Sequence, residues 1–499
     1  MRFCLSREAF MEHPLRVDEL SPAEAASSAL VIDAAPVTTA SATALPPLLN
    51  LPASEALLLR PSDAHYADYL AAANTRTRLN PALRAVCKTE HAVTVMVDWV
   101  RDNHLNFAVR CGGHSYEGFS QSADVVIDVR GLGIITVDKS AGLVTAGSGV
   151  SLYQVYQALA AQGLALQAGS CPTVGISGHV MGGGHGLLAR SHGLTCDSLQ
   201  QINIVDSEGQ VLQADSASEP DLYWACRGGG GGSFGIATRF TLQVFPLSTA
   251  LVFGVSWKLS KAHAAQLFAA WQAWAPGAPA TITSIMKVGP AGGGLIGMRC
   301  IGQSIGSESA LRSQLKTLTT LQASSSPLTV QSLGFLAAVK HFAGPLAYEQ
   351  VYMKAKSDYV LSPLGSTAID AMMAAVAPVT AGGIVLLCDS YGGKISDVAA
   401  DATAFPYRAG TQYCIQYYSS WTRAADTPAH LAQVAKVYAA MRPYLPGASY
   451  VNYCDLDLPD YANAYWGENL GRLVAVKQHY DPDNLFHHAQ SVPVGLPMA

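Results

Sequence analysis

A histidine and a cysteine each stand within a glycine-rich segment. His114 lies in RCGGHSYEG (110–118), and Cys171 lies in GSCPTVGISGHVMGGGHG (169–186). A third such segment, CRGGGGGSFG, occupies residues 226–235. Glycine has no Cβ and tolerates positive φ, so its backbone N–H groups can close on an anion. Three such segments in one chain favour a phosphate-bearing cofactor over ordinary tight turns.

The glycine spacing excludes the commonest nucleotide motifs. No segment reads GxxxxGK[ST], and none reads GxGxxG between a strand and a helix of a βαβ unit. Taken alone, His114 would be interpreted as a structural histidine, and Cys171 as a small buried hydrophobe. His179, His185 and His192 follow no metal-ligand spacing, so no metal site is predicted.

Composition limits the class of protein. The chain has 499 residues, 49% hydrophobic and only 13% charged, with a net charge of −5. This composition is typical of a folded protein of two or three domains. No basic run suggests nucleic acid as a partner, and no apolar stretch of about 18 residues suggests a membrane span. The sequence leaves the oligomeric state open.

The first 56 residues are predicted to be a mobile leader. Acidic residues interrupt any apolar signal-peptide core near the start, and residues 22–56 are rich in Ala, Ser, Thr and Pro. The ten cysteines include no CxxC pair, so neither a zinc site nor a redox dithiol is indicated. Reduced, buried thiols are typical of a cytoplasmic protein, and we expect that location.

The first half of the chain alternates helical and strand patterns. Residues 89–110 predict a helix running into a strand, and residues 124–138 predict strands separated by a glycine turn. Residues 151–163 predict a helix capped by a serine and ended by a glycine, and residues 202–215 predict a hairpin.

From about Leu251 the pattern changes. A helix with apolar residues on one face is expected over 267–274, and YCIQYYSSW (413–421) is strongly β-prone. Further helices are expected from Thr427 and over 470–477. This half is consistent with a second domain, a sheet backed by helices.

The chain resembles bacterial-type members of the berberine bridge enzyme-like FAD-linked oxidases, within the vanillyl-alcohol-oxidase (PCMH-type) flavoproteins. The matching segments run from about residue 80 to 493 in the family's order: RCGGHSYEG, GSCPTVGISGHVMGGGHG, DLYWACRGGGGGSFG (221–235), KSDYV (356–360), YGG (391–393), TAFPYRAG (403–410), NYCDLD (452–457), YWGENLGRLVAVK (465–477), YDPDNLF (480–486) and QSVP (490–493).

The resemblance implies an α+β, two-domain PCMH-type fold. A FAD-binding domain would span 57–248, an antiparallel-sheet substrate domain 249–448, and a segment returning to the FAD domain 449–499.

The resemblance also implies FAD joined to the protein twice, through His114 to the flavin 8α-methyl and through Cys171 to C6. Two links hold the ring in place and raise its reduction potential. The expected cofactor-binding residues are His114, Cys171, Arg110, Gly112, Gly113, Ser115, Val174, Gly175, Gly178, Gly182, Gly183, Gly184, His185, Gly235, Ile236, Asn452 and Tyr453.

The family's tyrosine base falls on Tyr453, and Asp389 falls where some members carry its partner. A free tyrosine titrates near pH ~10, and an ionised Asp389 would raise that pKa further. Asp389 therefore helps only by accepting the phenolic proton or by steering hydrogen bonds. Alkaloid-oxidising members carry a glutamate where this chain has Cys414 or Gln416, which with Tyr116 are expected in the substrate pocket. A merely structural hydrogen bond is the alternative role for Tyr453.

The resemblance implies oxidation of a small hydroxyl-bearing substrate, a sugar or a secondary-metabolite intermediate. Val174 occupies the position thought to control access of O2, where a small side chain admits it; Val174 could instead serve only in packing. We therefore expect an oxidase that returns electrons to O2 and releases H2O2. The alternatives are a dehydrogenase with another acceptor and a non-catalytic flavin-binding protein.

Overall fold

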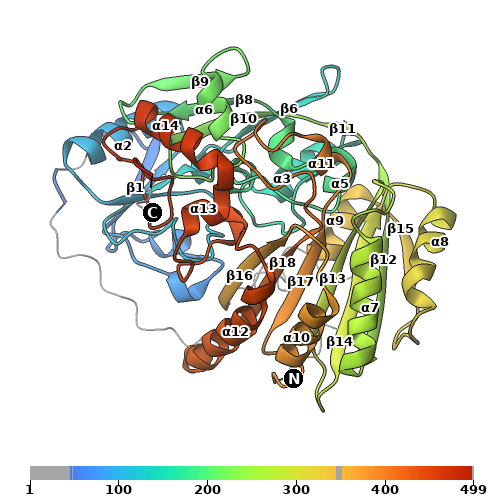
Figure 1. Cartoon of the computed structure of the whole chain (residues 1–499). Helices are drawn as coiled ribbons and strands as arrows, with labels where there is room; N and C mark the ends of the chain where they lie inside the picture. Colours follow the sequence, from blue (N-terminus) through green and yellow to red (C-terminus); the bar gives the residue numbers. More distant parts are fainter. Residues whose placement is uncertain (1–44, 48, 344–350, 381, 497–499) are drawn as a thin grey trace.

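The computed structural model of the chain describes residues 45–47, 49–343, 351–380 and 382–496 (Figure 1). Most of the expected leader, residues 1–44, lies outside the described residues.

Two sheets organise the first half of the chain. The first runs in the order β1-β2-β4-β3, with strands β1 (Ala56–Leu59), β2 (Leu83–Cys87), β3 (Phe107–Arg110) and β4 (Val125–Asp128). The second runs in the order β5-β6-β10-β8-β9, with strands β5 (Ile135–Asp138), β6 (Leu143–Gly147), β8 (Leu199–Val205), β9 (Val211–Asp215) and β10 (Ile236–Gln243). A separate short pair joins β7 (Leu164–Ala165) and β11 (Phe245–Pro246).

The helices of this half are short. They are α2 (Glu90–Asp102), α3 (Leu152–Ala160), α4 (Ile176–Met181), α5 (Ala189–His192) and α6 (Pro220–Ala225). Ser151 caps α3 in a reciprocal capping box with Gln154, and Gly163 beyond its end has φ +72°, as the sequence predicts.

The strands expected within 124–138 are present, but they belong to different sheets. β4 pairs with β2 and β3, whereas β5 pairs with β6. A turn over Val129–Gly131 carries the chain from one sheet to the other. A Cβ at Gly131 would lie 2.2 Å from the carbonyl oxygen of Cys87, so the close crossing requires glycine.

The second half is built on a seven-stranded sheet in the order β15-β12-β14-β13-β17-β18-β16, antiparallel at every pairing. Its strands are β12 (Thr249–Leu259), β13 (Ile282–Pro290), β14 (Ile296–Ser304), β15 (Thr329–Gly334), β16 (Tyr352–Val360), β17 (Val385–Ser390) and β18 (Tyr413–Trp421). Its helices are α7 (Lys261–Trp274), α8 (Glu308–Thr319), α9 (Phe335–Ala343), α10 (Ser366–Val376), α11 (Lys394–Asp397) and α12 (Thr427–Met441).

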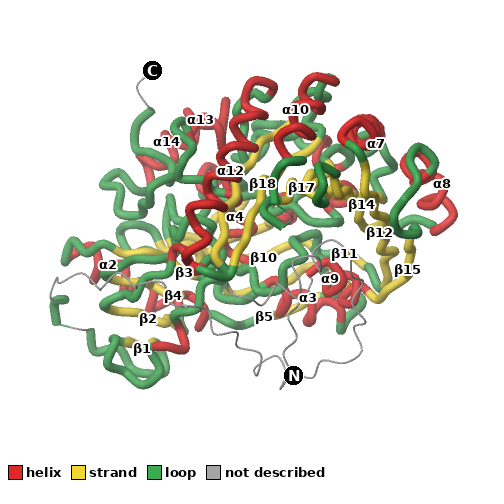
Figure 2. The backbone as a smooth tube through the Cα atoms, turned by 90° about the horizontal axis from the view of Figure 1, so that it is seen from below, coloured by secondary structure: helices red, strands yellow, loops and turns green. Residues whose placement is uncertain are grey.

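The two faces of this sheet have different neighbours. On one face Met286, Cys388 and Ile415 join a core with α7, α8, α10 and α12, which Figure 2 shows along one side of the strands. Because side chains alternate along a strand, the adjacent residues Ile285 and Asp389 point to the other face, toward the first half of the chain.

The C-terminal segment packs on the first half. α13 (Tyr461–Trp466) and α14 (Leu470–Tyr480) contribute to the same core as α3, α6 and β10. α14 ends at Tyr480, where the sequence has Asp481-Pro482. Within the described ranges no helix is long and apolar enough to cross a membrane.

Candidate active site

A cavity of about 460 Å³ lies between the glycine-rich segments, the sheet and the C-terminal segment. A cavity of this size is in the range of small-molecule and cofactor sites. Fourteen of the residues expected from the sequence line it: Gly112, Gly113, His114, Ser115, Tyr116, Cys171, Val174, Gly175, Gly178, His185, Gly235, Asp389, Asn452 and Tyr453.

Two glycines bring the histidine and the cysteine to the same wall. A Cβ at Gly112 would lie 2.3 Å from the backbone N of Gly175, and one at Gly175 would lie 2.1 Å from Cys111 Sγ. The two segments can therefore cross in backbone contact only because both residues are glycine. This crossing places His114 beside the turn that carries Cys171.

Thr173 connects the two residues expected to hold the cofactor. Its Oγ1 lies 2.8 Å from His114 Nε2 and 3.9 Å from Cys171 Sγ. Burial, and secondarily the charge of Arg110, lowers the pKa of His114 to about 4, so its imidazole is neutral at pH 7. Burial raises the pKa of the Cys171 thiol. The sequence analysis did not single out Thr173.

Arg110 lies behind this wall. Its side chain is buried, donates to the carbonyl of Ala71, and has Nε 3.9 Å from an oxygen of Asp128. It acts on the cavity through its charge rather than as part of the lining.

Other glycines form a cradle at the cavity. A Cβ at Gly178 would meet no atom within 4 Å, and one at Gly231 would meet only the Cα of Gly178, at 3.8 Å. The loop 229–232 thus faces Gly178 with bare backbone and lines the cavity. Such a wall fits a phosphate-bearing cofactor, since amides can approach it closely. The sequence showed this third segment, but no residue before Gly235 was selected from it.

Gly182, Gly183 and Gly184 were also expected at the cofactor, but neither they nor Ile236 are among the residues that line the cavity. A Cβ at these glycines would lie 2.1 Å from Asn452 Oδ1, 2.8 Å from Phe405 Cδ2 and 2.6 Å from Thr195 Oγ1, respectively. The three glycines thus serve close packing, and the Gly184 amide donates to Tyr450 Oη at 2.9 Å.

Tyr453 and Asp389 meet at the cavity, from the C-terminal segment and from β17. The Tyr453 hydroxyl lies near the Asp389 carboxylate, and hydrogen bonding from it favours the ionised form of Asp389. Burial raises the pKa of Asp389 to about 7, against the opposing effects of Lys287 and of this hydrogen bond. Burial, and then the charge of Asp389, raises the pKa of Tyr453 well above 10.

The loop that carries His114 and the sheet supply the neighbours of this pair. Tyr116 stacks on Tyr453, with ring centroids 5.6 Å apart and planes 3° apart. Gln416 Nε2 donates to Tyr116 Oη at 2.8 Å, so Gln416 acts through Tyr116. Cys414 is opposite Asp389 in the sheet but is buried among aromatic rings, outside the cavity lining.

Lys287 is a site neighbour that the sequence analysis missed. Asp389 pairs with Ile285 in the sheet, and Lys287 comes two residues after Ile285 on β13. Lys287 therefore projects from the same face of the sheet as Asp389. Burial lowers its pKa to about 8. A lysine within the apolar run 282–290 was the available signal, but only the strand register relates it to Asp389.

The three histidines near the glycine run separate in space. His179 Nε2 accepts from the Gly169 amide at 3.1 Å at the cavity wall, and His185 stacks on Tyr391. His192 stacks on Phe245, and His192 is not among the lining residues. No group of three metal-ligating side chains occurs in the part of the chain that the structure describes.

Two family models match the two parts of the chain that carry the residues expected at the site. A sequence model of the FAD binding domain matches residues 81–215, and one described as berberine and berberine like matches residues 449–493. The first range includes His114 and Cys171, and the second includes Tyr453.

Known proteins are similar over most of the chain. YgaK of Bacillus subtilis (strain 168), named an uncharacterized FAD-linked oxidoreductase, is 32% identical over 84% of this chain and 94% of its own. Berberine bridge enzyme-like C-1 of Nicotiana tabacum is 31% identical over 79% of this chain and 82% of its own.

Solved structures share the fold. The Physcomitrella patens BBE-like 1 structure superposes with a TM-score of 0.83 at 29% identity, over 89% of this chain and 98% of that chain. A berberine bridge enzyme variant in complex with (S)-reticuline superposes with a TM-score of 0.81 at 25% identity, over 89% and 97%. These likenesses confirm the expected PCMH-type α+β fold. The chain belongs to the berberine bridge enzyme-like family and is an FAD-linked oxidoreductase.

Proposed function

We propose that the protein is an oxidase that removes a hydride from a carbon bearing a hydroxyl group, on a sugar or a secondary-metabolite intermediate. The observation that carries this proposal is that Tyr453 and Asp389 lie together at the wall of the cavity that His114 and Cys171 also line. An acid–base pair beside a cofactor cradle is what alcohol oxidation requires.

His114 and Cys171 would hold FAD covalently. With His114 Nε2 engaged by Thr173, Nδ1 is the ring nitrogen left for a bond. The lowered pKa keeps the imidazole neutral, and only a neutral imidazole has the lone pair that such a bond needs. Bound FAD would supply the hydride acceptor and a route for the electrons to O2, with H2O2 as the second product.

Tyr453 and Asp389 would move the hydroxyl proton together. Tyr453 Oη accepts the proton from the substrate while its own proton passes to the Asp389 carboxylate. This route forms no free phenolate, which the raised pKa of Tyr453 strongly disfavours. Asp389, with a pKa of about 7, is the final proton acceptor.

The rate of flavin reduction should therefore depend on pH through Asp389. Below a pH of about 7 Asp389 is protonated and cannot accept, so the rate rises as pH increases through this value. Lys287→Met removes a charge that lowers the pKa of Asp389, so the rising limb should move to higher pH. Stopped-flow bleaching of the flavin across pH measures this shift.

Arg299→Met is the matched control. Arg299 faces Lys287 from β14, but its lowered pKa comes from burial and not from the charge of Asp389. It should leave the limb closer to the wild-type position. A limb that stays in place in Lys287→Met, or moves to lower pH, contradicts the assignment to Asp389.

O2 as acceptor is supported by Val174, a small side chain at the cavity three residues after Cys171. Val174→Leu adds one methylene group there and should slow reoxidation in air, while anaerobic reduction changes little. The measurement is stopped-flow mixing of the reduced protein with air-saturated buffer. Equal reoxidation rates for wild type and variant contradict the gating role, and slow reoxidation of both favours the dehydrogenase alternative.

The substrate class is open to direct test. Anaerobic mixing with sugars and with polyketide-type and peptide-type alcohols should bleach the flavin for at least one group. Absence of bleaching by every hydroxyl donor would instead favour a non-catalytic flavin-binding protein.

We also place the protein in the cytoplasm, because the nine cysteines within the described ranges are free thiols.

A further inference from the structure

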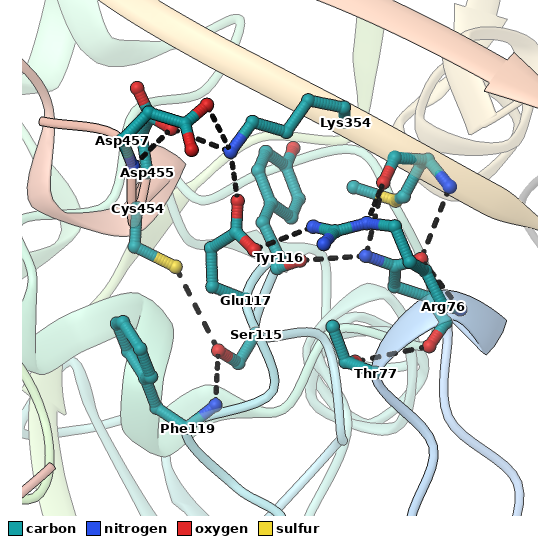
Figure 3. A network of polar contacts seen from close by, with 12 residues as sticks. Arg76, Thr77, Ser115, Tyr116, Glu117, Phe119, Lys354, Cys454, Asp455 and Asp457 are labelled. Carbon is teal, nitrogen blue, oxygen red and sulfur yellow. Dashed lines mark hydrogen bonds and ion pairs between the residues drawn. The ribbon is translucent and has the colours of Figure 1, made fainter. Parts of the chain in front are cut away.

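A charged network lies at the edge of the seven-stranded sheet, outside the cavity. Lys354 of β16 is its centre, with Nζ 2.5 Å from Glu117 Oε1 and 2.6 Å from Asp455 Oδ1 (Figure 3). These three side chains are almost fully buried. Three more charged residues complete the network: Arg76 at 2.5 Å from Glu117, and Lys356 and Asp457 at 2.7 Å from each other.

The carboxylates of the network belong to the two loops that carry the stacked tyrosines. Glu117 directly follows Tyr116, and Asp455 comes two residues after Tyr453. Lys354 binds both, so one ammonium group connects the loop of His114 and Tyr116 with the loop of Tyr453. Figure 3 shows Glu117 below the Lys354 nitrogen and the two aspartates, Asp455 and Asp457, to its left.

The same strand also holds the backbone of the first loop. Asn74 donates to the Tyr116 carbonyl at 2.6 Å and accepts from the Met353 amide of β16 at 3.1 Å. From the adjacent strand, Gln416 holds the Tyr116 hydroxyl. The Tyr116 ring is thus fixed relative to the sheet that carries Asp389.

Stability alone does not explain such a network. Desolvation of buried charges is costly, and well-packed apolar residues in their place are often equally stable or more so. A fully satisfied polar network does restrict the geometry of the groups it joins. Here those groups are Tyr116 and Tyr453.

We propose that Lys354 is a positioning residue, which holds Tyr116 and Tyr453 in their stacked arrangement and so directs the Tyr453 hydroxyl toward Asp389. This inference rests on the proposed role of Tyr453 as proton acceptor. Lys354 lies on the opposite face of β16 from Ser357 and Tyr359. Because it lies outside the cavity, it acts only through the two loops. A misplacement of about 1 Å can lower a rate by about 10²-fold.

The test removes Lys354 and its two buried carboxylate partners together. Lys354→Met alone leaves two buried carboxylates without their shared cation and can unfold the protein. The triple variant Lys354→Met, Glu117→Gln, Asp455→Asn avoids this. It should retain covalent flavin, and its anaerobic bleaching by the fastest donor of the panel should fall by about 10- to 100-fold, with donor affinity changed less.

The matched control is the double variant Arg442→Met, Asp358→Asn, which likewise leaves no buried carboxylate without its cation. Arg442 pairs with Asp358, which is buried on the same face of β16, and neither residue forms an ion pair with Glu117 or Asp455. Bleaching in this control should stay within about twofold of wild type.

The triple variant in a Tyr453→Phe background separates the two hypotheses. If Lys354 acts through Tyr453, the losses are not additive, and the combined protein is about as slow as Tyr453→Phe alone. Additive losses, or a triple variant as fast as the Arg442→Met, Asp358→Asn control, overturn the positioning role. A Tyr453→Phe variant as fast as wild type overturns the proposed function instead.

A crystal structure of the triple variant decides the positioning role independently of activity. The ring centroids of Tyr116 and Tyr453 should separate beyond the 5.6 Å of the wild type. An unchanged stack overturns the inference.

Discussion

Tyr453→Phe is expected to lower the rate of anaerobic flavin bleaching by about 10²–10⁴-fold, the usual value of general-base assistance. The change removes one hydroxyl and keeps the ring, so the stack on Tyr116 and the flavin attachment should survive. Without the hydroxyl, the substrate proton has no path to Asp389. Donor affinity should change far less than the rate. Asp389→Asn removes the final proton acceptor, so it should cause a comparable loss and remove the pH limb near 7.

Tyr391→Phe is the matched control for this experiment. Tyr391 also lies near Asp389, but its hydroxyl pairs with Tyr359 at 3.1 Å, and Tyr391 is not among the residues that line the cavity. Its loss of a hydroxyl should leave the rate close to that of wild type. If Tyr453→Phe is as fast as this control, the proton leaves by another route, and Tyr116 and Gln416 are the next residues to test.

Denatured wild-type protein is expected to keep its yellow colour and to carry the mass of FAD. His114→Ala and Cys171→Ala should each retain the flavin through the remaining link, and the double variant should release all of it. The reason is geometric, since both side chains line one wall and share contact with Thr173. Intact-mass measurement after acid precipitation reads the result directly.

Cys111 and His179 provide controls of the same residue types at the same cavity. Cys111→Ala and His179→Ala should both retain the full mass of FAD after denaturation. Release of free FAD from the wild type by acid would show that neither link forms.

The sequence predicted the local elements and the cavity residues that stand in strong motifs. The cap at Ser151 and the β-prone run of β18 follow from short-range pattern, and both are present. His114, Cys171, Asp389 and Tyr453 follow from the family resemblance, and the structure brings all four to one cavity. Their chemical roles stay predictions.

The features that were missed depend on contacts between distant segments. Which glycines face the cavity is decided by what lies opposite each one, so Gly231 was missed and Gly183, packed on Phe405, was selected. Lys287 gains its meaning from the register of β13 and β17. The ion pair of Glu117 with Lys354 joins residues 237 positions apart, and no local pattern indicates it.

The most direct test of the whole account is product analysis after aerobic turnover of the fastest donor. The account predicts equal amounts of H2O2 and of a product in which one hydroxyl carbon has become a carbonyl. Donor consumed without H2O2, or a product that keeps every hydroxyl group, would contradict it.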